Sequence, residues 1–414
     1  MSPNNNTGEL QVNVVSAGNS RPIPDARVSI SFTGEPNSTI EELTTDSSGQ
    51  TETIDLESPP LEYSLNPTIE IQPYSEYTLT ITASDFEPIS ISGTEILPTV
   101  TALQNVRMRP LTPGTEQEEV FVIPAHTLYA EYPPKIPEAE IKPVRETGEI
   151  VLSRVVVPEY IVVHDGSPRD TTAQNYYVKY KDYIKNVASS EIYATWEPNA
   201  IRANVLAIMS FTLNRVYTEW YRNQGYDFTI TSSTAFDHKW IPERNIYDTI
   251  SVIVDELFAN YLSRPNVKQP ILTQYCDGRR VQCPNWMTQW GSQSLAERGY
   301  SAIEILRYYY GDNMYINTAP EISGIPSSWP GYNLEQGSTG DKVRQMQEQL
   351  NVIAGAYPAI PKITADGIYG PATAAAVRKF QSVFGLPVTG VVDYKTWYKI
   401  SEIYVGVSRI AELV

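Results

Sequence analysis

Glu191 stands where a carboxyl group could act as a general acid. The residues before it place apolar side chains at the spacing of one helix face: Tyr180, Ile184, Val187 and Ala188. Glu191 follows Val187 by four residues, so it falls within this apolar stripe. Burial disfavours the charged form of a carboxyl, and such a group can hold a proton near neutral pH and give it to a substrate. The alternative is a structural glutamate that pairs with a cation such as Arg202 or caps a neighbouring helix.

Two further segments must position this residue. Residues 199–221 are apolar over most of a helical surface, which predicts the core helix of the domain. In residues 287–312, a polar and aromatic turn enters a helix that ends in three tyrosines.

The charge of the chain excludes some partners. The net charge of the whole chain is −17, and residues 1–150 hold 23 acidic and 7 basic side chains. Nucleic acid is not an expected partner, because phosphate binding needs clustered Lys and Arg. No apolar run is long enough to span a bilayer, and the first ten residues lack the charged and apolar regions of a signal peptide.

The N-terminal third predicts a small β-sandwich over residues 1–110. Apolar and polar residues alternate around Val12 and Val28, a turn sequence occupies residues 44–50, and a further strand-like stretch follows at 77–83. The spacing of PIPDARVSI and TTDSSGQ resembles the carboxypeptidase-regulatory and collagen-adhesin B-type domains. The resemblance implies a spacer or protective module.

Residues 111–157 are rich in Pro and Glu, a composition that predicts a linker without a core of its own. The linker is either a tether of fixed purpose or a site where an activating protease cuts. The favoured window for cleavage lies at the end of the linker and includes Arg145, Glu149, Leu152 and Val155. Residues 1 to about 150 would then be a removable pro-region, the alternative being a permanent spacer.

Residues 333–403 predict a small three-helix bundle, because two helical faces alternate with glycine turns. The motif residues include Asp366-Gly367-Ile368-Tyr369-Gly370, Phe380-Gln381 and Thr396-Trp397. This pattern closely resembles the peptidoglycan-binding domain 1 family. Most of these residues are expected to be structural, and Tyr369 is the preferred candidate for contact with glycan.

The middle of the chain carries a second resemblance. SSEIYATW, NAIRANVLAIMSF and TQWGSQSLAERGYSAIEILRYYYGD, in this order, resemble the SpoIID family of sporulation lytic transglycosylases over about residues 158–316. The resemblance implies that Glu191 is the catalytic acid, with Gln289, Trp290 and Gly291 in the substrate cleft. Tyr193, Gln289 and Trp290 become candidates for stacking and hydrogen bonding with sugars.

The resemblance to the SpoIID family implies a reaction that needs only one carboxyl group. The acid protonates the glycosidic oxygen, and its conjugate base then takes a proton from the 6-hydroxyl of muramic acid, which closes a 1,6-anhydro ring. No cofactor is required.

Some members of the family bind a metal through Cys and His. Cys276, Cys283 and His238 are one ligand short of a closed tetrahedral site, so we expect no structural zinc. The two cysteines form either a loop disulfide or two idle thiols. His238 is expected to be a hydrogen-bonding residue of the surface or the substrate cleft.

The sequence therefore predicts a multidomain α+β protein. We expect a β-sandwich at 1–110, a linker at 111–157, an α+β catalytic domain at 158–316, a linker at 317–332, a three-helix bundle at 333–403 and a tail at 404–414. The domain order is similar to that of clostridial spore cortex-lytic enzymes, which implies a precursor located in the spore cortex or coat that cleaves cortex peptidoglycan during germination. The competing hypothesis is a wall-binding scaffold without catalytic activity.

Overall fold

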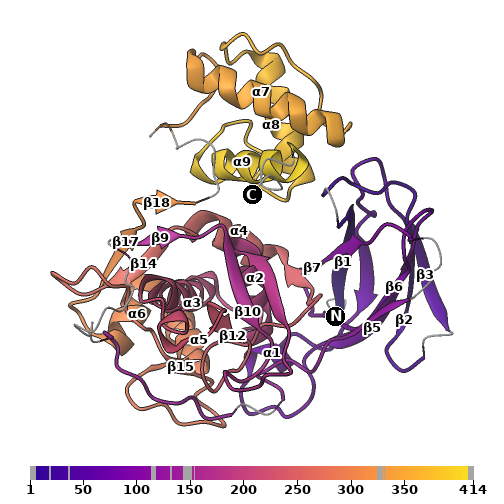
Figure 1. Ribbon diagram of the computed structural model, residues 1–414. Helices are drawn as coiled ribbons and strands as arrows, with labels where there is room; N and C mark the ends of the chain where they lie inside the picture. The colour runs from indigo at the N-terminus through magenta and orange to yellow at the C-terminus, as the bar shows by residue number, and fades with distance from the viewer. Residues whose placement is uncertain are drawn as a thin grey trace.

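The computed structural model describes residues 6–17, 20–35, 38–112, 118–130, 133–142, 152, 154–323, 330 and 332–408. Sheets dominate the N-terminal part, helices and short strands make up the middle, and three helices stand at the C-terminal end (Figure 1). The fold is thus mixed α+β with several sheets, as the sequence predicted. Within these ranges, the helices are too short or too polar to cross a bilayer.

Two sheets form the N-terminal part. The first has the strand order β13-β7-β1-β4 and the second the order β3-β2-β5-β6-β8. Val12, Val28 and Leu79 are buried, as the alternating pattern predicts for strands with one apolar face. The elements are β1 (Thr7–Ser16), β2 (Arg27–Phe32), β3 (Thr39–Thr44), β4 (Ile54–Glu57), α1 (Glu62–Leu65), β5 (Ser75–Thr82), β6 (Ile89–Ile96), β7 (Thr101–Met108), β8 (Glu119–Val122) and β13 (Ile246–Tyr247).

The turn predicted at residues 44–50 packs tightly against the first sheet. The Asp46 Oδ1 atom accepts the backbone N–H groups of Ser48 at 2.8 Å and Gln50 at 3.1 Å. Gly49 has a φ of +71°, and a Cβ atom there would lie 2.4 Å from the carbonyl oxygen of Val14. Only glycine fits this turn.

The middle part surrounds one nearly fully buried helix, α3, which starts with a proline at its first turn. Its elements are β9 (Val156–Val157), β10 (Tyr160–His164), β11 (Asn175–Lys179), α2 (Tyr180–Glu191), α3 (Pro198–Tyr217), η1 (Arg222–Gln224), β12 (Ile230–Thr231), α4 (Asp248–Leu257), β14 (Asn260–Ser263), β15 (Tyr275–Cys276), β16 (Met287–Thr288), α5 (Gln289–Glu297), α6 (Ala302–Tyr310), β17 (Tyr315–Thr318) and β18 (Glu321–Ile322).

The helices α2 and α3 lie where the apolar periodicity predicted them. The segment 287–312 differs, because it holds two helices rather than a turn and one helix. The second of them, α6, begins with a capping box in which Ser301 and Glu304 exchange side-chain to backbone hydrogen bonds.

The Pro-rich segment is not a simple linker. Residues 119–122 form β8, and beyond it His126, Leu128 and Lys135 are buried. Its described residues are ordered by packing against the middle part, which composition alone does not reveal.

The predicted cleavage window is only partly described. Arg145 and Glu149 lie outside the described residues. The Leu152 N–H donates to the Tyr217 carbonyl oxygen at 3.0 Å, and Val155 is buried. The described end of this window is therefore packed, whereas we expected an exposed segment.

The C-terminal helices are α7 (Asp341–Ala356), α8 (Pro371–Val383) and α9 (Tyr394–Ser408). The helix α9 faces the middle part, as Figure 1 shows. Lys181 on α2 pairs with Glu402 on α9 at 2.6 Å, and the ring of Phe258 stacks on Tyr394 at 5.6 Å. The Gln50 side chain also donates to the Val383 carbonyl oxygen at 2.7 Å, so the C-terminal helices contact both other parts.

Candidate functional site

Glu191 is the last residue of α2, and its side chain has no exposed surface. Its Oε1 atom accepts the backbone N–H of Lys239 at 2.6 Å, and its Oε2 atom accepts the hydroxyl of Tyr275. Arg202, the cation that we considered as a structural partner, pairs with Glu256 instead. The carboxyl is therefore held by two hydrogen-bond donors without a direct ion pair to Arg202.

Burial raises the pKa of Glu191 above its ordinary value of 4.5. The nearby cation of Lys135 and the hydrogen bonds from Tyr275 and Lys239 oppose this shift without cancelling it. A carboxyl with a raised pKa keeps its proton at a higher pH than an exposed glutamate, as a general acid must.

Lys135 comes from the Pro-rich segment and lies beside this carboxyl. Its Nζ atom donates to the Asp237 carbonyl oxygen at 2.6 Å and lies 4.6 Å from the centre of the Tyr275 ring. Burial lowers the pKa of Lys135 to about 8, and the nearby Glu191 and Asp237 carboxylates counteract part of this effect. Lys135 is thus still charged at neutral pH. The sequence did not indicate that Lys135 lies near Glu191, because only the tertiary fold brings these two residues together.

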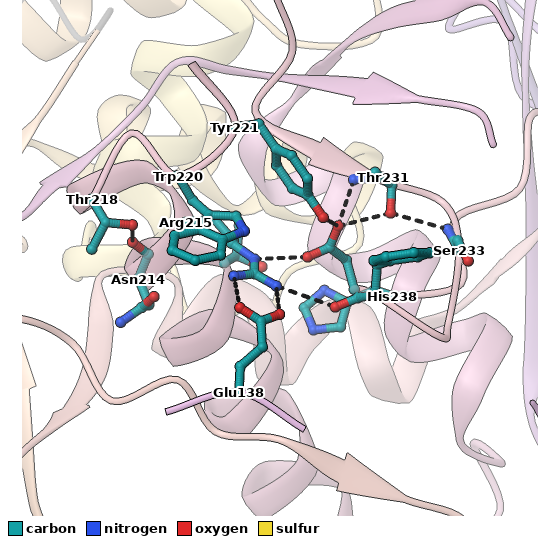
Figure 2. A network of polar contacts seen from close by, with 12 residues as sticks. Glu138, Asn214, Arg215, Thr218, Trp220, Tyr221, Thr231, Ser233 and His238 are labelled. Carbon is teal, nitrogen blue, oxygen red and sulfur yellow. Dashed lines mark hydrogen bonds and ion pairs between the residues drawn. The ribbon is translucent and has the colours of Figure 1, made fainter. Parts of the chain in front are cut away.

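Arg215 lies in a network of polar contacts (Figure 2), and its ion-pair partner Asp237 is a second buried carboxylate. Its Oδ1 atom accepts the Arg215 Nε–H at 2.7 Å. Its Oδ2 atom accepts the Tyr221 hydroxyl at 2.6 Å, together with the backbone N–H and the hydroxyl of Thr231. Glu138 of the Pro-rich segment binds the other side of the same guanidinium. Both oxygens of Asp237 thus accept hydrogen bonds from the protein, and Asp237 holds Arg215 and Thr231 in place.

His238 is buried, in contrast to the surface or cleft position that we expected. Its Nδ1 atom and the Tyr183 hydroxyl are 3.0 Å apart, and its ring stacks on Tyr275 with the ring centres 5.8 Å apart. Burial lowers the pKa of His238 well below its ordinary value, and the cations of Lys135 and Arg215 lower it further. The neutral ring supports Tyr275, and Tyr275 in turn donates to Glu191.

Tyr193 and Trp196, which follow Glu191 closely in the chain, form an aromatic cluster with Trp290 of α5. The ring centres of Tyr193 and Trp290 are 6.0 Å apart, and those of Trp196 and Trp290 are 5.0 Å apart. Tyr193 also packs against His126, with the ring centres 4.6 Å apart. The fold thus brings together Tyr193 and Trp290, two of the predicted sugar-binding residues.

Gln289 and Gly291 flank Trp290 at the start of α5. Gln289 is buried, and neither its Oε1 nor its Nε2 atom has a hydrogen-bond partner among the residues that the structure describes. A buried amide without partners is costly unless a ligand satisfies it. At Gly291, a Cβ atom would lie 2.1 Å from the hydroxyls of both Thr288 and Tyr309. Gly291 therefore permits close packing rather than binding through a side chain.

Cys276 and Cys283 form a disulfide with a Cα–Cα distance of 5.9 Å, which decides between the two alternatives that the sequence left open. Tyr275 directly precedes this bridge, so the closed loop helps to position its hydroxyl. In the described part of the chain, His, Cys, Asp and Glu side chains form no cluster of three that could hold a metal ion.

Tyr369 lies inside the C-terminal bundle. It is 1% exposed, and its hydroxyl donates to the Gly390 carbonyl oxygen at 2.9 Å. The ring thus fills the core of this part, whereas we expected it to be available for glycan. The adjacent Ile368 is 55% exposed.

Comparison with known proteins identifies the C-terminal part. Residues 339–400 match the family of peptidoglycan binding domains. The zinc D-Ala-D-Ala carboxypeptidase of Streptomyces albus G is 42% identical over 77 residues, which are 18% of this chain and 28% of that protein. A protein from the bpoA1 3′ region of Kitasatospora aureofaciens is 41% identical over 68 residues, or 16% of this chain and 53% of that protein. The chain therefore spans at most about half the length of these two relatives.

Among solved structures, the SleB N-terminal domain is 28% identical, with 19% of this chain and 99% of that chain covered and a TM-score of 0.17. The match to the family model lies within the helices that the sequence assigned to wall binding. Residues 339–400 are therefore a peptidoglycan binding domain.

Proposed function

We propose that this protein is a peptidoglycan lytic transglycosylase that uses Glu191 as its single catalytic acid and base. The environment of Glu191 carries the proposal: a buried carboxyl, with a raised pKa, held by the Tyr275 hydroxyl and the Lys239 N–H. The resemblance of residues 158–316 to the SpoIID family supports the same assignment.

The reaction is a proton shuttle at one carboxyl group. Protonated Glu191 gives its proton to the glycosidic oxygen while the bond from that oxygen to the anomeric carbon breaks. The Glu191 carboxylate then takes the proton of the muramic acid 6-hydroxyl, whose oxygen bonds to the anomeric carbon and closes the 1,6-anhydro ring. An intramolecular attack needs no activated water and no second carboxylate. The hydrogen bonds that both Asp237 oxygens accept from the protein agree with this scheme.

In this proposal, the residues around Trp290 bind the substrate. The rings of Tyr193 and Trp290 are suited to stacking on the apolar face of a sugar. The unpartnered amide of Gln289 can accept and donate hydrogen bonds to glycan hydroxyl or acetamido groups. The peptidoglycan binding domain at 339–400 holds the enzyme on its insoluble substrate.

We further propose that the substrate is spore cortex and that the protein is made as an inactive precursor in the cortex or coat. The domain order is similar to that of spore cortex-lytic enzymes of the SleC type. An activating protease would cut near the C-terminal end of the Pro-rich segment and separate the acidic N-terminal part from the catalytic part.

The products of digestion test the activity. Cortex fragments are incubated with the protein after cleavage within residues 143–150 and analysed by mass spectrometry. Anhydro-muramic ends are the expected product, and these ends must be absent with Glu191→Gln. Reducing ends instead would identify a hydrolase and contradict the mechanism.

The second candidate is a wall-binding scaffold without activity. The complete burial of Glu191 favours it, because a catalytic acid must reach its substrate. In that case the wild type and Glu191→Gln release no fragments, before or after cleavage, and both still bind peptidoglycan.

A further inference from the structure

Part of the Pro-rich segment lies directly against the residues on both sides of Glu191. We call residues 123–130 and 133–142 the strap. The Thr127 hydroxyl of the strap donates to the carbonyl oxygen of Ser190, the residue before Glu191, at 2.7 Å. Lys135 donates to the carbonyl oxygen of Asp237, two residues before Lys239, whose N–H binds the Glu191 carboxylate. The strap is thus attached to two of the segments that enclose Glu191.

The strap also occupies a face of the predicted sugar-binding rings. The His126 ring packs against Tyr193 with the ring centres 4.6 Å apart and the planes 31° from parallel. A sugar that stacks on this face of Tyr193 would need the position that His126 holds. The His126 N–H donates to the Tyr74 hydroxyl at 2.9 Å, which connects the strap to the N-terminal part.

Two glutamines of the middle part bind the backbone of the strap. Gln274 donates to the Ile136 carbonyl oxygen at 2.8 Å and accepts the Glu138 N–H at 2.9 Å. Gln269 accepts the Lys142 N–H at 2.6 Å and donates to the carbonyl oxygen of the same residue at 3.2 Å. Together with the pairing of Glu138 and Arg215, these contacts hold the strap much as a groove holds a bound peptide.

We infer that the strap is an intramolecular inhibitor, with His126 blocking the stacking face of Tyr193 and with Thr127 and Lys135 anchoring the strap beside Glu191. This inference rests on the proposed function. It assigns the block to the strap, while the N-terminal sheets anchor the strap through Tyr74. Cleavage after residue 142 turns the strap from an intramolecular into a bimolecular ligand, and dilution then releases it.

The test compares variants of the full-length chain in the release of soluble fragments from purified cortex. Lys135→Met removes the cation and keeps most of the side-chain volume, and Thr127→Val removes the hydroxyl that binds Ser190. Lys268→Met and Thr171→Val are the matched controls, because both residues are exposed and lie outside the strap. A further version carries the recognition sequence of a site-specific protease within residues 143–150, and circular dichroism checks the folding of every variant.

We expect the uncut wild type and both controls to be nearly inactive. Lys135→Met and Thr127→Val should be about 10-fold more active than the uncut wild type, because the loss of one buried hydrogen bond shifts the docking equilibrium of the strap by about this factor. The cut and diluted chain should be the most active form. Thr127→Val preserves the test if Lys135→Met does not fold.

The possible failures can be told apart. If the uncut wild type is as active as the cut chain, or if both strap variants are no more active than the wild type, the strap is not an inhibitor. If the cut chain, freed of the fragment that contains the strap, releases nothing from cortex, the proposed function itself is wrong.

Discussion

Glu95 and Arg244 form a fully buried, bidentate ion pair between strand β6 of the N-terminal part and the middle part. The Arg244 Nη1 and Nη2 atoms donate to the two carboxylate oxygens of Glu95 at 2.6 and 2.5 Å. Nη2 also donates to the Ser189 carbonyl oxygen, two residues before Glu191. The N-terminal part is therefore tied directly to the end of the helix that carries the candidate catalytic acid.

We expect Glu95→Ala to lower the free energy of unfolding by about 3–5 kcal/mol, because it leaves the Arg244 charge buried without a partner. Urea denaturation followed by tryptophan fluorescence measures the loss. Glu52→Ala, at an exposed position, serves as the control and should change stability by less than about 0.5 kcal/mol. The Glu95→Ala, Arg244→Met double variant should recover part of the loss, and equal stability of Glu95→Ala and the wild type would contradict the role of this pair.

Glu191→Gln should lower the rate of glycan cleavage by at least about 10²-fold, since it removes the only proton donor of the proposed reaction. Binding to peptidoglycan should not change, because the binding domain lies at 339–400. The comparison uses the cut chain, with release of soluble fragments and co-sedimentation as the two measurements. Glu297→Gln, at an exposed glutamate of α5, is the matched control. Near-normal turnover of Glu191→Gln would refute the mechanism.

The pH dependence of cleavage should reflect the raised pKa of Glu191. A general acid must be protonated at the start of the reaction, so the rate should fall as the pH rises through this pKa, at a pH above 4.5. The Lys135 cation lowers the pKa of Glu191 while the strap is docked, so Lys135→Met should raise the pKa of Glu191 in a carboxyl NMR titration of the uncut chain. An unchanged Glu191 titration in Lys135→Met would show that this cation does not act on Glu191.

Acid should destabilise the packing of α2 against α4 in the middle part. Burial alone would raise the pKa of Asp255, but the cations of Lys181 and Lys185 outweigh it and hold the pKa below its ordinary value of 3.8. A lowered pKa contributes stability at pH values above 3.8, and this contribution is lost as the pH falls through the pKa of the folded state. Thermal unfolding midpoints should thus drop below about pH 4. Asp255→Asn should be less stable at neutral pH and should show a smaller drop in acid.

Deletion of residues 333–414 should weaken co-sedimentation with peptidoglycan more than it weakens cleavage of short soluble fragments. The binding domain raises the local concentration of glycan at the catalytic site, an advantage that applies only to an insoluble substrate. Unchanged co-sedimentation of the shortened chain would count against this role.

Local patterns in the sequence were enough to predict several elements. Helical periodicity placed Glu191 on a buried face of α2, and alternation placed Val12 and Val28 in strands, because both patterns follow from which side of an element is buried. The motif around Tyr369 predicted the peptidoglycan binding domain, although the ring of Tyr369 itself is buried.

Such local patterns could not predict the residues that contact Glu191. Tyr275 and Lys135 are far from Glu191 in the chain, and neither has a local signal that could indicate the contact. The Pro and Glu content of the strap predicts a linker that does not pack against the rest of the protein, and this prediction was wrong for the strap. Its order comes from hydrogen bonds to Gln269 and Gln274, which no property of the strap's own residues reveals.

The short strand β13 of the middle part protects one edge of a sheet in the N-terminal part. It lies more than a hundred residues beyond β7 in the chain, yet it pairs with Ala102 and Leu103 and covers this part of the sheet edge. The Gln104 side chain of β7 also donates to the Glu243 carbonyl oxygen at 2.8 Å. During synthesis, β7 has no partner on this edge until residues 246–247 have been made. The proposed proteolytic separation would open this part of the edge again, and open strand edges pair readily with other chains. A released N-terminal fragment would therefore tend to self-associate, which would remove it from solution and make its separation from the enzyme effectively irreversible.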